Sequence, residues 1–370
     1  MIQNTKYLRF LLFIFFILNI GAFLFKIVSA QTHSTNDTRI KIKLLKQLKT
    51  NYHHENFGFQ NIHKQYKIKK NITIAVIDTG IDPNHPLIKN NLWLPKRKTN
   101  AQHYGYDFSK VAKSTYRPYD THGHGTHIAG IIKGIFPSAR LLILKYYNPL
   151  ASGQDNLRST IKALRFAIQH NVDIINYSGG GPESSLEEVK LLKLAHQKGI
   201  LIISAAGNES SDIDRKNTAY YPASYRLPNI ISVSAHDQNK NILPSSNFGK
   251  KSVDILAPGK RIPSSLPNNR SGYLTGTSQA TAFVTGVTAI IKYRFPKLSL
   301  RQIKAIINQS AKKSISLKNK CLSGGLLDAN AAIRLAAKIS SQKPRNLAKV
   351  LPIISNSPGQ IIYRTSASSN

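Results

Sequence analysis

Short apolar runs, each bounded by polar residues, recur along the chain from residue 72 onward. They span Ile72–Asp78, Leu141–Tyr147, Val172–Ser178, Ile200–Ala206 and Ile230–Ala235. The runs are nearly continuous rather than alternating between apolar and polar positions. Continuous runs are typical of strands that are buried on both faces, and therefore of a parallel sheet.

Segments with apolar residues at three- and four-residue spacing alternate with these runs, which predicts helices between the strands. The predicted helices span Leu157–His170, Leu186–Gly199, Thr277–Phe295, Ser299–Ala311 and Asp328–Ile339. Ser299 and Gln302 have the spacing of a capping box. The alternation predicts an α/β fold with three layers, in which helices cover both faces of a mostly parallel central sheet.

The N-terminus has a different pattern. Lys6 and Arg9 precede an apolar run from residue 10 to 25, and the small residues Val28 and Ala30 follow it. This order is typical of a secretory signal peptide over residues 1–30 and predicts a secreted or periplasmic protein. An uncleaved N-terminal membrane anchor is the alternative. We expect a basic segment over 31–55, one folded domain over 56–340, and a polar, flexible tail over 341–370.

The chain is strongly basic, with 52 Lys and Arg against 17 Asp and Glu and a net charge of +35. Such a charge favours acidic partners such as anionic lipid or polyanionic polymers. The basic residues are spread along the chain without a recognisable nucleic-acid-binding module, so we predict no specific nucleic acid partner. Cys321 is the single cysteine, which excludes an internal disulfide. We expect a monomer.

Polar residues follow several of the predicted strands at their carboxyl ends. Asp78 ends the first run, Ser178 ends another, and Asn208 follows a third. In open α/β sheets, functional groups gather beyond the carboxyl ends of the strands. We therefore expect these three side chains on one edge of the sheet.

The stretch Asp120–Gly130, DTHGHGTHIAG, holds His122, His124 and His127. Such a cluster could form a metal site, supply a general base at a helix start, or belong to a turn. The spacing His-x-His-x-x-His is not that of a metalloprotease helix, and no Glu is nearby. We therefore predict no metal and no cofactor.

Ser278 supplies a candidate nucleophile, because it follows Gly-Thr and opens an apolar helix within Leu274–Gly286. The free N–H groups and dipole of a helix start favour negative charge on an adjacent oxygen. His124 could serve as its base, and Asp78 could orient the imidazole. Nucleophile, base and orienting acid are the parts of a catalytic triad.

The order Asp, His, Ser within the motifs DTG, HGTHIAG and GTSQATAFVTG resembles the subtilisin-like serine proteases. The motifs AAGN and SGGGP extend the resemblance, which covers residues 56 to 337. It implies a serine endopeptidase that cleaves extended protein substrates through an acyl-enzyme, with Ser278 as nucleophile, His124 as base and Asp78 as orienting acid. His127 then has a structural role and His122 is solvated.

The resemblance also implies how the substrate is held. Asn208 donates to the oxyanion, and Ser178, Gly179, Gly180 and Gly181 form an edge that pairs with the substrate backbone. Glu209 lies near the bottom of the pocket for the residue that precedes the cut. We expect broad cleavage after large apolar residues, with basic residues tolerated through Glu209.

The chain departs from the family pattern in its details. Ala282 stands where proline is common, and only residues 31 to about 55 are available as a pro-segment. The calcium-binding loop of many relatives is absent from the segment 131–145, although Asp212 and Asp214 could gather a weak site. Two alternatives remain open, a catalytically silent binding protein on the same fold and a basic envelope- or polyanion-binding protein.

Overall fold

The computed structural model describes residues 72–95, 103–109 and 116–342. The predicted signal peptide, the basic segment and residues 343–370 of the tail lie outside the described residues. Within these ranges, no helix combines the length and the hydropathy that are needed to cross a bilayer.

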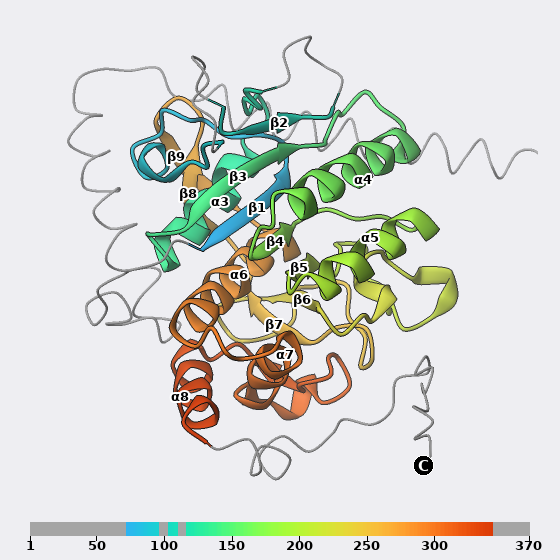
Figure 1. Cartoon of the computed structure of the whole chain (residues 1–370). Helices are drawn as coiled ribbons and strands as arrows, with labels where there is room; N and C mark the ends of the chain where they lie inside the picture. The colour runs from blue at the N-terminus through green and yellow to red at the C-terminus, as the bar shows by residue number, and fades with distance from the viewer. Residues whose placement is uncertain (1–71, 96–102, 110–115, 343–370) are drawn as a thin grey trace, which may run out of the picture. The chain divides into compact units, whose positions relative to one another are not determined.

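A nine-stranded sheet runs through the described part of the chain, in the order β10-β11-β7-β6-β5-β4-β1-β3-β2 (Figure 1). Its neighbouring strands pair in parallel except β10 and β11, which are antiparallel. The strands are β1 (Thr73–Asp78), β2 (Gly105–Asp107), β3 (Arg140–Lys145), β4 (Ile174–Tyr177), β5 (Leu201–Ala205), β6 (Ile230–His236), β7 (Ile255–Pro258), β10 (Lys312–Lys313) and β11 (Gly325–Leu326).

The described helices are α3 (His124–Ile135), α4 (Gly153–Gln169), α5 (Leu186–Gln197), α6 (Thr277–Arg294), α7 (Leu300–Gln309) and α8 (Ala329–Ser340), with short 3₁₀ helices at Lys89–Asn91, Lys216–Thr218, Ala223–Tyr225 and Ile315–Leu317. Side-chain oxygens of Ser152, Ser185 and Asp328 cap the starts of α4, α5 and α8. The predicted capping box of Ser299 and Gln302 is present at α7. Each cap satisfies an N–H group that the first helical turn leaves without a partner.

Both faces of the sheet are apolar, which explains the continuous runs in the sequence. Ile74 and Val76 of β1 pack into the core under α3, α6, α7 and α8. Ala75 and Ile77 of the same strand pack into the core under α4 and α5. Successive strand residues point to opposite faces, so a strand between two helical layers must be apolar throughout. The three-layer α/β prediction is confirmed.

A hairpin outside the main sheet was not predicted from the sequence. It joins β8 (Ile262–Leu266) to antiparallel β9 (Arg270–Leu274). Asn268 and Asn269 in its turn have positive φ angles of 62° and 55°. Asn tolerates this left-handed region, and two such residues in succession are typical of tight hairpins.

The register of the sheet brings the predicted site residues to one edge. Ile77 of β1 lies beside Tyr177 of β4, and Tyr177 lies beside Ser204 of β5. Asp78 and Ser178 therefore stand one position further along adjacent strands, about 4.8 Å apart in the hydrogen-bonding direction.

Candidate active site

Asp78 and His124 form a close pair at the carboxyl end of β1. The Nδ1 atom of His124 lies 2.7 Å from Oδ1 of Asp78, and that oxygen also accepts a 2.8 Å hydrogen bond from the N–H of Thr79. The Asp78 side chain is only 2% exposed, whereas that of His124 is 23% exposed. Because Nδ1–H donates to the carboxylate, the neutral imidazole keeps its free lone pair on Nε2.

The electrostatics of this pair favour a proton on the ring. Burial lowers the pKa of His124, but the charge of Asp78 and its hydrogen bond outweigh this, and Asp120 adds to them. The pKa of His124 is therefore raised above its usual value of 6.5. A raised pKa makes the ring a stronger base toward a hydroxyl proton.

Asp120 fixes the start of the helix that carries His124, a role that was not predicted from the sequence. This carboxylate is fully buried. Its Oδ1 accepts from the N–H groups of His122 and Gly123 and from the Thr79 hydroxyl. Its Oδ2 accepts from the N–H and the hydroxyl of Thr126. These five bonds join the end of β1 to the first turn of α3.

Gly125 lets α3 approach β1 closely. A Cβ at Gly125 would lie 2.2 Å from the carbonyl oxygen of Gly80 and 3.2 Å from Oδ1 of Asp78. A side chain would therefore push the helix away from the strand and lengthen the contact between His124 and Asp78.

The three histidines of Asp120–Gly130 separate in space. His122 is exposed, and its ring centroid lies 6.3 Å from that of His124. His127 is buried, with Nε2 at 3.0 Å from the Ile262 carbonyl oxygen and 3.3 Å from that of Gly272. His127 therefore joins α3 to the hairpin. A structural role was predicted for it, but this partner was not. Among the described residues, no three His, Cys, Asp or Glu side chains are grouped as a metal ion would need.

Ser278 is the second residue of α6 and is 7% exposed. Its hydroxyl donates a 2.8 Å hydrogen bond to the carbonyl oxygen of Ser178. The hydroxyl is therefore held by the neighbouring strand end rather than by the imidazole.

Asn208 lies on the exposed loop after β5, beside the start of α6. The N–H of Thr277 donates to Oδ1 of Asn208 at 3.0 Å. Because an N–H donor needs an acceptor, this contact fixes which end of the amide is which. The Nδ2 group, with its two N–H donors, is left at the other end.

Gly181 is the last residue of the predicted substrate edge. Its N–H donates to the Tyr221 carbonyl at 3.0 Å, and its carbonyl accepts from the Tyr221 N–H at 2.7 Å. Both backbone groups of Gly181 are thus paired within the protein. Ser178, Gly179 and Gly180 precede this bridge and follow the end of β4.

Glu209 is exposed, but its carboxylate is not free. Oε2 of Glu209 accepts a hydrogen bond from Nδ2 of Asn247, and its N–H donates to Oδ1 of Asn247. Burial raises the pKa of Glu209, which its hydrogen bonds partly oppose. Its predicted place at the bottom of a substrate pocket stays a prediction.

A pocket of about 260 Å³ adjoins the glycine-rich edge. Its lining includes Gly180 and Gly181, several aromatic residues, Glu183 and Glu188. Glu188 is 1% exposed and accepts hydrogen bonds of 2.9 Å from the hydroxyls of Tyr177 and Tyr225. No salt bridge among the described residues involves Glu183 or Glu188.

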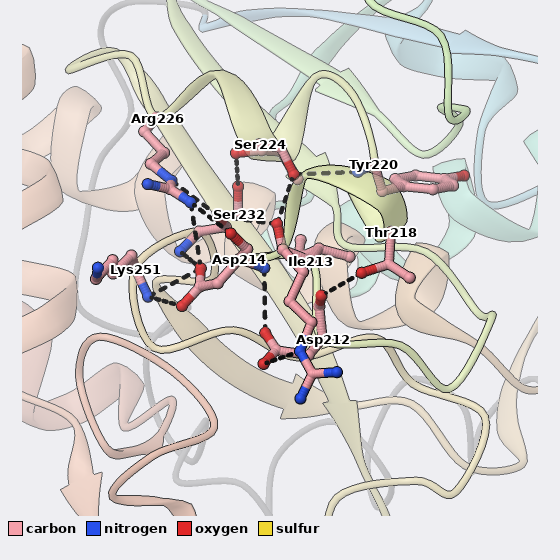
Figure 2. A network of polar contacts seen from close by, with 12 residues as sticks. Asp212, Ile213, Asp214, Thr218, Tyr220, Ser224, Arg226, Ser232 and Lys251 are labelled. Carbon is pink, nitrogen blue, oxygen red and sulfur yellow. Dashed lines mark hydrogen bonds and ion pairs between the residues drawn. The ribbon is translucent and has the colours of Figure 1, made fainter. Parts of the chain in front are cut away.

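Asp212 and Asp214, the acids considered for a weak cation site, take part in a polar network of the protein (Figure 2). Asp214 accepts 2.8 Å hydrogen bonds from the N–H groups of Lys251 and Ser252, and Arg226 lies 3.6 Å away. Asp212 accepts from the Asp214 N–H at 3.1 Å and lies 3.6 Å from Arg215. Both carboxylates thus already have protein donors.

The model of the subtilase family matches residues 69–329, which is most of the described chain. The chain belongs to the subtilase family. It is 37% identical to the major intracellular serine protease of Bacillus subtilis (strain 168), over 60% of this chain and 69% of that protein. It is 32% identical to subtilisin DY of Bacillus licheniformis, over 65% of this chain and 84% of that protein.

A solved structure supports the same assignment. The protease domain of PatA superposes with a TM-score of 0.58 at 26% identity, over 72% of this chain and 95% of that domain. This subtilase is therefore a subtilisin-like serine endopeptidase that hydrolyses peptide substrates.

Proposed function

We propose that Ser278, His124 and Asp78 are the catalytic triad of this subtilase. The observation that carries the proposal is the 2.7 Å contact between His124 and Asp78, one strand away from the carbonyl of Ser178 that holds the Ser278 hydroxyl. Nucleophile, base and orienting acid thus come from α6, α3 and β1 and meet at one edge of the sheet, as triad chemistry requires.

The reaction begins when the Ser278 hydroxyl turns from the Ser178 carbonyl toward Nε2 of His124. Oγ then bonds to the carbonyl carbon of the substrate, and its proton passes to Nε2. The C–N bond breaks as His124 returns that proton to the leaving amine. A water molecule then adds its oxygen to the acyl carbon and gives a proton to His124. The bond between Oγ and the acyl carbon breaks as His124 returns that proton to Oγ, which releases the acid and regenerates Ser278. Asp78 stabilises the imidazolium in both steps.

The oxyanion of each tetrahedral intermediate accepts from Nδ2 of Asn208 and from the N–H of Ser278. The Ser278 N–H lies in the first turn of α6, where N–H groups have no intrahelical partner. In subtilisin, a member of the same family, removing one such donor lowers kcat by about 10²–10³-fold. The Thr277 bond to Oδ1 supports this role because it presents Nδ2 as the donor.

Substrate binds as an added strand along Ser178, Gly179 and Gly180. These residues follow β4, and main-chain pairing with an extended peptide would continue the sheet pattern. A Cβ at Gly179 would lie 2.1 Å from the Tyr146 hydroxyl, so the chain is closely packed behind this edge. Main-chain pairing with the substrate stops before Gly181, because the backbone groups of Gly181 are already bonded to Tyr221.

The pocket next to this edge supports a preference for a basic substrate side chain on the acyl side of the cut. Two of its lining residues, Glu183 and Glu188, are acids without a salt bridge among the described residues, in a chain with only 17 acids. Burial raises the pKa of Glu188. A cation in the pocket would favour its ionised form. For the residue that precedes the cut we expect large apolar side chains, with basic ones tolerated through Glu209.

Export through the N-terminal segment is part of the proposal, and it rests on the sequence alone. Lys6 and Arg9, the apolar run after them, and Ala30 support a signal peptide. We expect a mature monomer whose charge promotes association with acidic surfaces that weakens with added salt. N-terminal sequencing of the protein recovered from medium and from membranes separates a cleaved signal from an anchor.

Labelling with a fluorophosphonate probe tests the triad. The purified chain should react, Ser278→Ala should not react at all, and His124→Ala should react very slowly. His122→Ala is a matched control on the exposed neighbour and should keep the parent rate. A severe loss in His127→Ala with a mild one in His124→Ala would show that the base is wrongly assigned. A folded parent chain that never reacts would favour a silent binding protein.

A further inference from the structure

The loop that carries Asn208 lies against a distant segment of the chain. Residues 206–211 follow β5, and residues 245–248 lie between β6 and β7. Backbone bonds join Ser210 to Ser245 and Phe248 to Ser211, each at 2.9 Å. Asn247 stands at the centre of this contact and is 1% exposed.

The side chain of Asn247 makes four hydrogen bonds to this loop, two through Oδ1 and two through Nδ2. Its Oδ1 accepts from the N–H groups of Glu209 and Ser211 at 3.0 and 2.9 Å. Its Nδ2 donates to the Ala206 carbonyl at 2.9 Å and to the Glu209 carboxylate. An amide is the group that offers two donors and an acceptor at this size, so neither Asp nor Ser can replace it.

Asn247 is itself held in place. The hydroxyls of Ser234 and Ser246 donate to its backbone carbonyl. Its N–H donates to the Gly207 carbonyl at 3.0 Å. Gly207 has a φ of +98°, and a Cβ there would lie 2.4 Å from Nδ2 of Asn247. Glycine therefore permits both the turn of the loop and the close approach of the amide.

We propose that Asn247 is the positioning residue for the oxyanion donor Asn208. Asn247 bonds both neighbours of Asn208, Gly207 through its backbone and Glu209 through its side chain. The backbone of Asn208 is thus held from both sides, and the Thr277 N–H bonds its Oδ1. The inference rests on the proposed role of Asn208.

Misplacing the oxyanion donor should lower kcat and leave KM nearly unchanged, because the negative charge on the substrate oxygen develops only in the transition state. Asn247→Ala should therefore lower kcat by at least about tenfold, up to the about 10²–10³-fold expected for Asn208→Ala. Asn247→Asp keeps the size of the side chain, but it loses both N–H donors and places a second carboxylate beside that of Glu209. We expect the same fall in kcat with a nearly unchanged KM.

A double-mutant cycle separates positioning from general destabilisation. If Asn247 acts through Asn208, Asn247→Ala should cost little further kcat in an Asn208→Ala background. Asn229→Ala is the matched control, because Asn229 is fully buried and donates to the carbonyls of Leu192 and Ile200 before β6 begins. It should lower Tm and keep kcat.

Full kcat in both Asn247 variants would overturn the inference and leave the triad assignment intact. So would a double mutant whose loss of kcat equals the product of the two single losses. Full kcat in Asn208→Ala would instead overturn the proposed oxyanion donor. If Asn247→Ala does not fold, the same two measurements on Asn247→Asp decide the question.

Discussion

Lys133 gives a pH dependence of stability that can be worked out from the structure. It lies in the last turn of α3, 6% exposed, and its ammonium donates to the carbonyl oxygens of Pro137 and Ala139. No salt bridge among the described residues involves it. Burial without a counter-ion lowers its pKa to about 7.

The number of protons bound in each state decides whether stability rises or falls with pH. In the unfolded chain Lys133 regains a pKa of about 10.4, so between about pH 7 and 10 the unfolded state holds a proton that the folded state lacks. Folding stability from this group therefore rises with pH, by about 1.4 kcal/mol per pH unit. Below about pH 7 both states hold the proton and the full cost of burying the charge remains.

Chemical denaturation at several pH values tests this reasoning. Ser278→Ala serves as the background, so that self-digestion does not distort the transition. Lys133→Met should have its greatest relative stability at and below about pH 7, and that advantage should shrink by about 3 kcal/mol between pH 7.5 and 10. Lys162→Met, at an exposed position on α4, is the control and should show a constant difference. A constant difference for Lys133→Met as well would refute the argument.

Three further predictions concern the site. Asp78→Asn removes the charge that raises the pKa of His124, so kcat should fall by about 10⁴-fold and the acid limb of the rate profile should move to lower pH; an unmoved limb would contradict this. Glu188→Gln should weaken cleavage of peptides with an upstream basic residue, measured with a peptide library, whereas the exposed neighbour Glu187→Gln should not. Because the acids of Figure 2 already have protein donors, excess chelator should leave Tm nearly unchanged; a drop restored by calcium and not by magnesium would reveal a missed site.

Much of the sheet could be predicted because burial on both faces leaves a direct trace in the sequence. Strand β1 begins at Thr73, one residue after the predicted start, and ends at Asp78 as predicted. β3 ends at Lys145, two residues earlier than expected. The short strands were missed for a physical reason. β7, Ile255–Pro258, is too short to show a period. In the hairpin, β8 is largely buried but no residue of β9 is, so β9 lacks an apolar pattern.

The triad candidates were found because each stands at the end of a regular element next to glycine or another small residue. The residues that position them were not found, because their contacts are distant in sequence. The side chain of Asn247 bonds groups 36 to 41 residues away, and Asp120 reaches back 41 residues to Thr79. The same limit applies to Gly181, whose partner Tyr221 follows it only after another strand and helix.

In the free enzyme, the Ser278 hydroxyl donates to the Ser178 carbonyl rather than to His124. On the proposed assignment, a bound peptide offers its own N–H to that carbonyl and competes with the hydroxyl for it. Filling the acyl side of the cleft thus releases the nucleophile toward His124. Small reagents that leave that side empty, such as simple esters and fluorophosphonates, should therefore react with Ser278 more slowly than an extended peptide does. On this assignment, turnover should increase with the length of peptide that occupies the acyl side of the site.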